Sequence, residues 1–242
     1  MEEDPPTISP QDKPGYLSTI WESIRINYIF YITCVLCLWW LCRHTRSSMF
    51  SSLYTFIFIS LFGYVAHVIS HLAEHFKITD MLDTHFNNVL TSPKNWFQSI
   101  ISKYLWFNDF HDKIHHDTTI NKQPINIMWE FIGNFWMQAG ILLLTKYLLF
   151  YTDNSTIVLW GISYATVHNI NYVISPSEVH MNHHCDKFTN YGIDLWDIVF
   201  NTKYPGDPIE DINHYSINFI ISTLIISCWV WWWYNHTPTH KS

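Results

Sequence analysis

Residues 49–75 read MFSSLYTFIFISLFGYVAHVISHLAEH, and this stretch decides the fold. Met49 to Ser70 contains no Asp, Glu, Lys or Arg. A helix that crosses a bilayer needs about 20 mostly apolar residues, so this run is long enough. Histidines recur at intervals of four towards its end, at His67, His71 and His75, and form one stripe along a helix. The stretch therefore predicts a membrane-spanning helix that ends in a row of imidazoles.

Further apolar runs of the same kind lie on both sides of it. They extend from Ile26 to Cys42, from Met128 to Phe150, from Thr156 to Val173 and from Tyr215 to Tyr234. The composition agrees with a membrane protein, because 48% of the residues are hydrophobic, 18% are aromatic and only 14% are charged. A soluble domain has about 25% charged residues. The sequence predicts an all-α integral membrane bundle of four to five transmembrane helices.

The polar segments complete the expected organisation. Residues 1–15 are polar and rich in proline, which predicts a disordered N-terminal tail, and residues 16–242 form a single membrane-embedded domain. In the polar stretch 76–126, Ser92-Pro93 is a typical helix start, and apolar residues follow at helical spacing. This part predicts an amphipathic helix on the membrane surface.

Charge and cysteine content exclude two classes of protein. With 13 Lys and Arg against 20 Asp and Glu, the chain has no basic excess for binding nucleic acid. Its five cysteines show no paired spacing, which favours reduced thiols over a disulfide framework.

Ten of the fifteen histidines lie in clusters beside the predicted spans. The clustered residues are His67, His71, His75, His111, His115, His116, His168, His180, His183 and His184. Residues three and four apart share one face of a helix, so a His-x-x-His-His sequence directs three imidazoles to one place. Imidazole is a good ligand for iron, zinc and copper, and polar side chains at membrane depth are usually functional. These ten histidines are the predicted metal ligands.

The number of imidazoles indicates two metal ions. A structural zinc takes four ligands and a catalytic zinc takes three plus water, which is fewer than the eight to ten available here. The chain contains neither the His-Glu-x-x-His motif of zinc peptidases nor the Glu-x-x-His pair of soluble di-iron bundles. The predicted site is rich in histidine and poor in carboxylates.

The predicted crossings bring all clusters to one membrane face. Two spans precede the first cluster, and a hairpin of the third and fourth spans through residues 151–155 returns the chain for the last cluster. That face carries nine Lys and Arg against four on the other, which makes it cytosolic by the positive-inside rule.

The last cluster continues as His180-Met-Asn-His-His-Cys-Asp-Lys-Phe-Thr-Asn-Tyr-Gly-Ile-Asp-Leu-Trp-Asp197. It resembles the third histidine box of the fatty acid hydroxylase / sterol desaturase superfamily of membrane-bound di-iron enzymes. In that family His-x-x-His-His is followed by Asn-Tyr-Gly and Trp-Asp. His168, near the end of a span, matches a further ligand position, and the resemblance covers roughly residues 60–205.

The first two boxes leave alternatives open. The second box of the family reads His-x-x-His-His, but here Asp112 stands three residues before His115 and His111 stands one residue earlier. Either His111 or Asp112 fills that ligand position. In the first box the binding pair is His67/His71 or His71/His75.

Residues around the boxes are expected to support the ligands. Asp197 is expected to accept the second N–H of a ligating imidazole, as carboxylates around metal sites do. Asn190, and Asp112 if it is not a ligand, belong to the same supporting layer. Gly192 suits a backbone turn, and Asn201 stands where the family often has glycine.

The resemblance implies an oxidoreductase in which two Fe ions and O₂ hydroxylate or desaturate a lipid, either a sterol or a fatty acyl chain. It also implies the endoplasmic reticulum membrane and an external electron donor, cytochrome b5 with its NAD(P)H reductase. The chain has no Gly-x-Gly-x-x-Gly motif for a dinucleotide of its own. Hydroxylation and desaturation share the hydrogen abstraction, so the boxes do not separate them.

Two alternatives follow from the same residues. One is a His-rich membrane protein that binds or transports zinc, although transport ligands should line the interiors of the spans rather than their ends. The other is a non-catalytic relative of the family, because the second box is altered.

Overall fold

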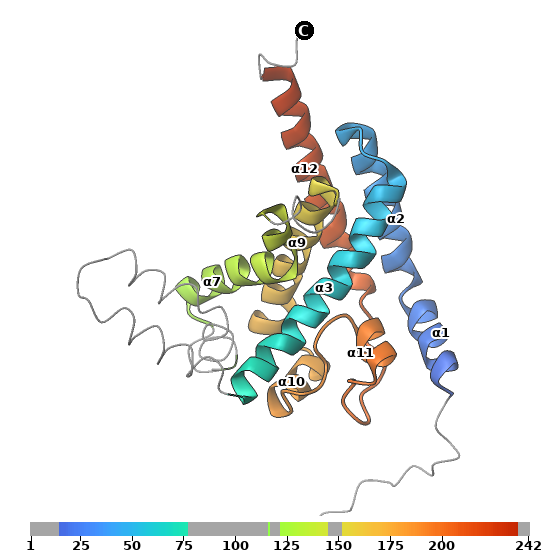
Figure 1. Ribbon diagram of the computed structural model, residues 1–242, viewed down its shortest axis with the longest axis vertical. Coiled ribbons are helices and arrows are strands. Elements are labelled where there is room, and N and C mark those ends of the chain that lie inside the picture. The colour runs from blue at the N-terminus through green and yellow to red at the C-terminus, as the bar shows by residue number, and fades with distance from the viewer. Residues whose placement is uncertain (1–14, 77–115, 117–121, 145–151, 237–242) are drawn as a thin grey trace, which may run out of the picture.

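The computed structural model describes residues 15–76, 116, 122–144 and 152–236, and the regular structure of this part is helical, without strands (Figure 1). The α-helices are α1 (Tyr16–Ile26), α2 (Tyr28–Thr45), α3 (Met49–His75), α7 (Pro124–Phe135), α9 (Asn154–His168), α10 (Glu178–Cys185), α11 (Asp194–Phe200) and α12 (Ser216–His236). Two π-helical segments, η2 (Trp136–Gly140) and η3 (Asn169–Ile174), extend α7 and α9, and a 3₁₀ turn, η4 (Asn213–Tyr215), precedes α12. The all-α prediction is confirmed for these residues. The predicted surface helix after Ser92 and residues 1–14 of the predicted tail lie outside them.

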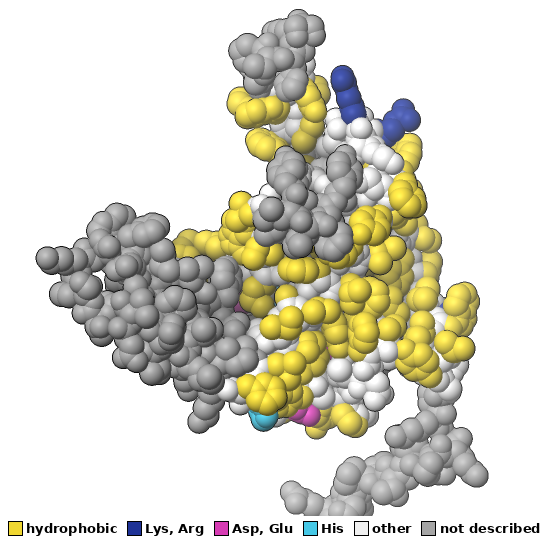
Figure 2. Space-filling view, in the orientation of Figure 1, with side chains coloured by type: hydrophobic (Ala, Val, Ile, Leu, Met, Phe, Trp, Pro, Cys, Tyr) yellow, Lys and Arg dark blue, Asp and Glu magenta, His cyan; other side chains and the backbone are white. Residues whose placement is uncertain are grey.

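Three of the described helical stretches are long and apolar enough to cross a membrane. They are Met49–Leu72, Pro124–Leu144 and Asn213–His236. α1 and α2 meet the same criterion only as a pair bent by 63°, which gives at most four such stretches in the described chain. Large apolar side chains point outward from them, and Figure 2 shows hydrophobic side chains spread over the visible face of the bundle. An exposed apolar surface of this extent is expected of helices that face lipid.

The run Thr156 to Val173, which the sequence presents as another span, is α9 followed by η3 and is not among these stretches. α9 packs against α3, α7, η2 and α12. Its buried residues lie on all sides, because a helix surrounded by other helices has no polar face. α9 is therefore the central helix of the described bundle.

The predicted first span, Ile26 to Cys42, corresponds to α2, and a bend that the apolar pattern does not predict lies at its start. Asn27 separates α1 from α2, and its side chain is fully buried. Asn27 Nδ2 donates to the carbonyl of Glu210 at 2.9 Å, and the amide of Ile212 donates to Asn27 Oδ1 at 2.8 Å. Asn213 Nδ2 in turn donates to the carbonyl of Ile26 at 2.7 Å. These bonds satisfy polar groups at the break and hold the bend in place.

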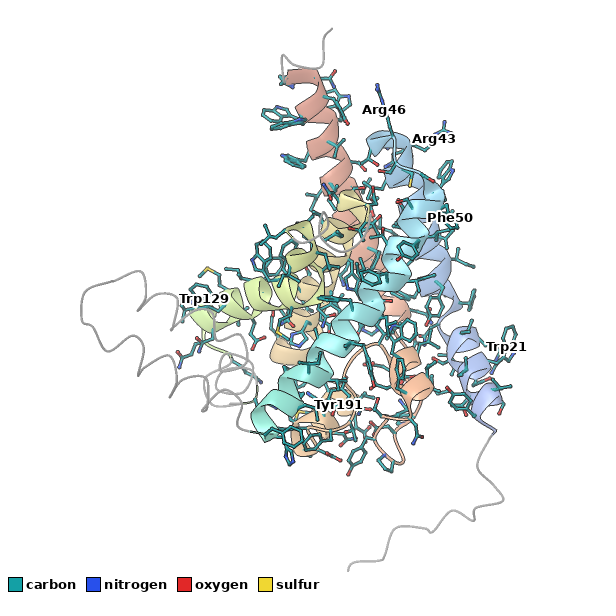
Figure 3. The ribbon with its side chains drawn as sticks, viewed as in Figure 1. Trp21, Arg43, Arg46, Phe50, Trp129 and Tyr191 are labelled. Carbon is teal, nitrogen blue, oxygen red and sulfur yellow. The ribbon has the colours of Figure 1, made fainter. Side chains whose placement is uncertain are left out.

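The positions of the helix ends show where the histidine boxes lie in the bundle. The start of α1, the end of α3, α10 and α11 lie at one end of the bundle, and the end of α12 lies at the other (Figure 1). Arg43 and Arg46 mark that second end (Figure 3). The first and third histidine boxes are therefore at the same end of the molecule.

Candidate metal centre

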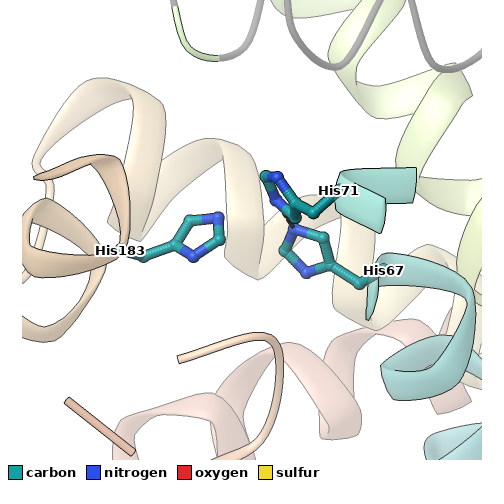
Figure 4. Close-up of side chains that lie close together, drawn as sticks. All are labelled: His67, His71 and His183. Atoms are coloured by element: carbon teal, nitrogen blue, oxygen red, sulfur yellow. Dashed lines mark hydrogen bonds between the residues drawn. The ribbon is translucent and has the colours of Figure 1, made fainter. Parts of the chain in front are cut away.

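Three histidines from two helices converge at that end of the bundle. His67 and His71 come from α3 and His183 comes from α10, and all three side chains are buried. Each offers one ring nitrogen, and these three nitrogens lie within 4.8 Å of one another. Figure 4 shows the His183 ring facing the pair from α3. This group could hold a metal ion.

The two histidines of α3 have the spacing of ligands to one ion. Their Nε2 atoms are 3.1 Å apart. Two nitrogens that each bind a metal at about 2.1 Å are separated by roughly 3.0–3.4 Å, depending on the angle between them. This spacing favours His67 and His71 over His71 and His75 as the pair of the first box.

His75 lies apart from the other two histidines of the first box. Its side chain is exposed, and its ring lies 5.1 Å from the ring of Phe76 and 5.3 Å from that of Phe188. Eight residues along a helix span about 12 Å, so His75 is too far from His67 to share its ion. Side chains at i, i+4 and i+8 share one face of a helix, but each lies at a different height along the helix axis.

Two backbone carbonyls orient His67 and His183. His67 Nδ1 donates to the carbonyl of Tyr191, and His183 Nδ1 donates to the carbonyl of Thr189 at 2.6 Å. A carbonyl only accepts, so each Nδ1 carries the hydrogen and each neutral ring keeps a lone pair on Nε2. This is the tautomer that a metal requires of a ring bonded in this way, and such outer bonds fix ligand orientation. Residues 189–191 thus hold one ligand from each helix.

Asn190, between these two carbonyls, gives the segment its shape. Its φ is +52°, in the left-handed region that asparagine tolerates better than most residues. Its Nδ2 donates to the carbonyl of Val179 at 3.0 Å and to Asp207 Oδ2 at 2.7 Å. The amide of Tyr204 donates to its Oδ1 at 3.0 Å. Asn190 therefore joins α10 to the segment that follows α11, next to the two carbonyls that bond the imidazoles.

The left-handed backbone conformation occurs at Asn201 and not at Gly192, where a turn was expected. Gly192 does not take the left-handed turn conformation. It packs against α3, where a Cβ would lie 3.4 Å from Cδ2 of Tyr64. Asn201 has a φ of +56° at the end of α11, where a left-handed residue ends the helix. Asn201 thus takes the left-handed conformation that glycine often supplies at a helix end.

Asp197 is connected to the histidines indirectly, through the backbone of Tyr191 and Gly192. Its carboxylate accepts the backbone amides of Tyr191 at 2.9 Å and Gly192 at 3.1 Å, and the hydroxyl of Thr202 at 2.8 Å. The prediction of a direct bond to an imidazole is wrong, because these donors lie between Asp197 and the rings. Burial raises the pKa of Asp197 to about 6, against the opposing effect of the same three hydrogen bonds.

A second pair of facing nitrogens lies within α10. The Nε2 atoms of His180 and His184 are 2.8 Å apart. Ser177 caps this eight-residue helix by accepting the amide of His180 at 3.2 Å, which fixes where the His-x-x-His-His sequence begins its turn. α10 therefore presents a second facing pair, whose nitrogens lie slightly closer together than the roughly 3.0–3.4 Å given above for two ligands of one ion.

Further rings connect the two pairs. The ring of His116 is 4.5 Å from that of His184 and 5.2 Å from those of His71 and His183. The ring of His168 is 5.6 Å from that of His180. Seven of the predicted ligands therefore form one continuous group, defined here as the histidine group: His67, His71, His116, His168, His180, His183 and His184. His111, Asp112 and His115 lie outside the described residues.

Glu130 and Asn134 adjoin this group, and the sequence reasoning did not select them. Asn134 Nδ2 donates to Glu130 Oε2 at 3.0 Å and lies 3.2 Å from Nδ1 of His168. Glu130 is 2% exposed. A single carboxylate in an otherwise apolar run is itself a signal of function and could have identified the position. The π-helical segment η3, which begins directly after His168, has no comparable signal, although such segments are frequent at functional sites.

A small cavity borders the histidine group. It measures about 20 Å³, enough for one water molecule, and is lined by His67, His168, His180 and Glu210 among others. Burial raises the pKa of the Glu210 carboxyl to about 7, and the nearby Asp194 adds to the effect. The cavity therefore places a carboxyl that titrates near neutrality beside the histidines.

No known family model, curated protein or solved structure matches the chain. The geometry of the histidine group therefore carries the functional argument.

Proposed function

We propose that the chain is a membrane-bound di-iron oxidoreductase, similar to the fatty acid hydroxylase / sterol desaturase superfamily, that hydroxylates or desaturates a lipid. The observation that carries the proposal is the histidine group itself. Its seven imidazoles are in continuous ring contact at one end of a bundle whose outer surface is apolar. A structural zinc site uses four ligands, so this number supports two ions.

The donor set fits two ions. His67 and His71 with His183 would hold one, and His180 and His184 would hold the other, with His116 and His168 beside them. The two facing Nε2 pairs, at 3.1 and 2.8 Å, are the observation that supports this assignment. Two irons bound here would supply the O₂-dependent oxidising power that removal of hydrogen from an unactivated C–H bond requires.

The chain's own residues provide orientation and surroundings for that chemistry. The carbonyls of Thr189 and Tyr191 hold two imidazoles in the ligand tautomer. A second cavity of about 20 Å³, lined by Phe30, Trp160 and Phe219, shares Tyr164, His168, Gly192 and Glu210 with the cavity at the histidine group. Each cavity has room for about one water molecule, so the apolar outer surface of the bundle is the observation that supports a substrate drawn from the bilayer.

The proposal includes an external electron donor, such as cytochrome b5 with its NAD(P)H reductase. The absence of a dinucleotide motif in the sequence supports it. Among the histidine group, His116 and His184 are half-buried, so the group is not sealed inside the bundle. We propose that the protein lies in the endoplasmic reticulum membrane with this end towards the cytosol. The predicted crossings assign nine Lys and Arg to this face and four to the other, which agrees with a cytosolic orientation.

Metal analysis and lipid analysis together test the proposal. The full chain is expressed in a host deficient in lipid hydroxylases and desaturases, then purified in nanodiscs. We expect about two irons per chain by elemental analysis and a new hydroxylated or desaturated lipid by mass spectrometry. His183→Ala should remove the product, whereas the control His236→Ala, at the exposed end of α12, should not.

Three outcomes would contradict the proposal. Zinc without iron, in protein that yields no lipid product, would support the zinc-binding alternative, because zinc has no redox chemistry. Iron without a product in any lipid class would support a non-catalytic relative. A product that persists in His183→Ala would show that the histidine group is not the site.

A further inference from the structure

Helix α1 presents three distinct faces. One face packs on α11, where the hydroxyl of Tyr16 donates to the carbonyl of Val199 at 2.6 Å. Ser23, on the same side, is fully buried. This contact leaves two outer faces of α1 uncovered in the described structure.

The two outer faces differ in chemistry. Leu17, Trp21 and Ile24 follow one another at i, i+4 and i+7 and are 77%, 66% and 37% exposed. The polar set is shifted by one residue, so it lies about 100° further round the helix and contains Ser18, Glu22 and Arg25. Glu22 and Arg25 form an ion pair at 2.5 Å. A helix with adjacent apolar and charged outer faces has the pattern of helices that lie in a membrane interface.

The apolar outer face of α1 continues along α2. Tyr28, Ile32, Val35 and Trp39 are exposed, and they extend the series that begins at Leu17. α2 belongs to the pair that is apolar enough to cross a membrane. The same surface therefore meets lipid on α2 and continues onto α1.

The bend between the two helices sets how α1 leaves the span. The angle is 63°, and the Asn27 and Asn213 side chains hold it with four hydrogen bonds, the fourth from the amide of Phe30 to Asn213 Oδ1 at 3.1 Å. With α2 set along the bilayer normal, a bend of 63° leaves α1 closer to the bilayer plane than to the normal. Tyrosine and tryptophan, both present here, favour the headgroup region.

We propose that α1 is an interfacial membrane helix that inserts Leu17, Trp21 and Ile24 into the lipid headgroup region at the end of the bundle that carries the histidine group. This role needs no metal and no reaction, so it stands apart from the proposed function. α11, on which α1 rests, carries Asp197, the residue that holds the Tyr191 turn. The inserted helix would thus set the histidine group at headgroup depth.

Site-directed spin labelling of the full chain in phosphatidylcholine nanodiscs tests the position of α1. Labels are attached to Leu17→Cys, Trp21→Cys and Ile24→Cys, with Ser18→Cys and Glu22→Cys as matched controls, in a background that lacks the accessible native cysteines. We expect the first three labels to be relaxed by oxygen and shielded from a water-soluble nickel reagent, at a depth of about 5–10 Å. The two controls should show the opposite pattern.

Two results would overturn the proposal. Labels at positions 17, 21 and 24 that are as open to the nickel reagent as the controls would place α1 in water. Spectra that change on dilution with unlabelled protein would assign the face to a second copy of the chain.

A measurement on unsubstituted protein removes any dependence on how the variants fold. A phospholipid with a photoreactive group near its headgroup is irradiated in the same nanodiscs, and adducts are mapped by mass spectrometry. We expect adducts at Leu17, Trp21 or Ile24 and none at Ser18 or Glu22. Adducts confined to α2 would contradict the interfacial position of α1.

Discussion

Asp197 accepts the backbone amide of Tyr191 at 2.9 Å, and the carbonyl of the same Tyr191 accepts the Nδ1–H of His67. A single residue, Tyr191, therefore links the position of a buried carboxylate to a metal-ligand candidate. The effect of a change at Asp197 on the histidines must pass through this backbone segment.

We expect Asp197→Asn to weaken metal binding by roughly 10–100-fold, the usual range for changes in the groups that support ligands. The amide would offer one acceptor oxygen to donors that now share two, and a buried donor left unpaired costs about 1–3 kcal/mol. Metal content after titration with a chelator measures the change. Asp211→Asn is the control, because Asp211 is exposed and, within the described part of the chain, accepts a hydrogen bond from the nearby amide of Asn213 alone. Equal retention of metal in both variants would refute the role of Asp197.

His71→Ala and His75→Ala separate the two candidate pairs of the first box. His71 shares the nitrogen group with His67 and His183, whereas His75 lies against Phe188 at the surface. We expect His71→Ala to lose metal and lipid product and His75→Ala to keep both near wild-type levels. Elemental analysis and lipid mass spectrometry check this, and loss of metal in His75→Ala would show that the stripe binds as a whole.

The sequence predicted the helical membrane scaffold because long uncharged runs such as Met49 to Ser70 are a strong and local signal. It could not show that α9 is buried among other helices, since a helix buried among helices and a helix surrounded by lipid are both apolar on all sides. The sequence pattern did not predict the bend at Asn27 either. It involves neither proline nor glycine, and the partners of Asn27, Glu210 and Ile212, lie more than 180 residues away.

For the site, spacing predicted which histidines share a helix face but not how deep each one lies. His71 and His75 are equivalent by spacing, and only the position of α10 and of the 189–191 segment distinguishes them. The hydrogen bonds that orient His67 and His183 could not be predicted from the sequence either. Thr189 and Tyr191 act through carbonyl groups, which every residue possesses, so no side-chain pattern marks them.

Asn134→Leu tests the connection between Glu130 and His168. Leucine has a similar volume but removes the amide that donates to Glu130 Oε2 and lies beside His168 Nδ1, and a buried carboxylate then loses a donor. We expect lipid product to fall by roughly 10–100-fold, with metal content reduced to a lesser degree. Asn235→Leu, at the exposed end of α12, is the control. Unchanged product in Asn134→Leu would remove Glu130 and Asn134 from the site.

Glu210 should make stability fall as pH rises. Its carboxyl is protonated in both states well below pH 4.5 and ionised in both above about 7, so between these values the folded chain holds a proton that the unfolded chain has lost. We expect Tm to decrease across this range by roughly 2–8 °C more in the wild type than in Glu210→Gln. Thermal unfolding of both proteins in nanodiscs at a series of pH values measures this difference. The histidines titrate in both proteins, so their contribution cancels in the comparison. Parallel curves for the two proteins would contradict the raised pKa.

Asn27→Leu should destabilise the chain without touching the histidine group. The substitution leaves the Glu210 carbonyl and the Ile212 amide without their side-chain partner, at about 1–3 kcal/mol for each buried group. We expect Tm to fall by roughly 4–12 °C, while Tyr28→Leu, at the exposed neighbouring position, should change it little. A Tm equal to that of wild type would show that the bend does not depend on these bonds.

The bond between His67 and Tyr191 joins residues 124 positions apart. At about 5–20 residues per second, a ribosome needs roughly 6–25 s to synthesise that interval. α3 therefore emerges and enters the membrane well before the carbonyl that orients its histidine has been made. Metal can be acquired in the final geometry only after the segment around Tyr191 has been synthesised, so a ribosome that stalls before this point leaves an inserted bundle with an unoriented His67.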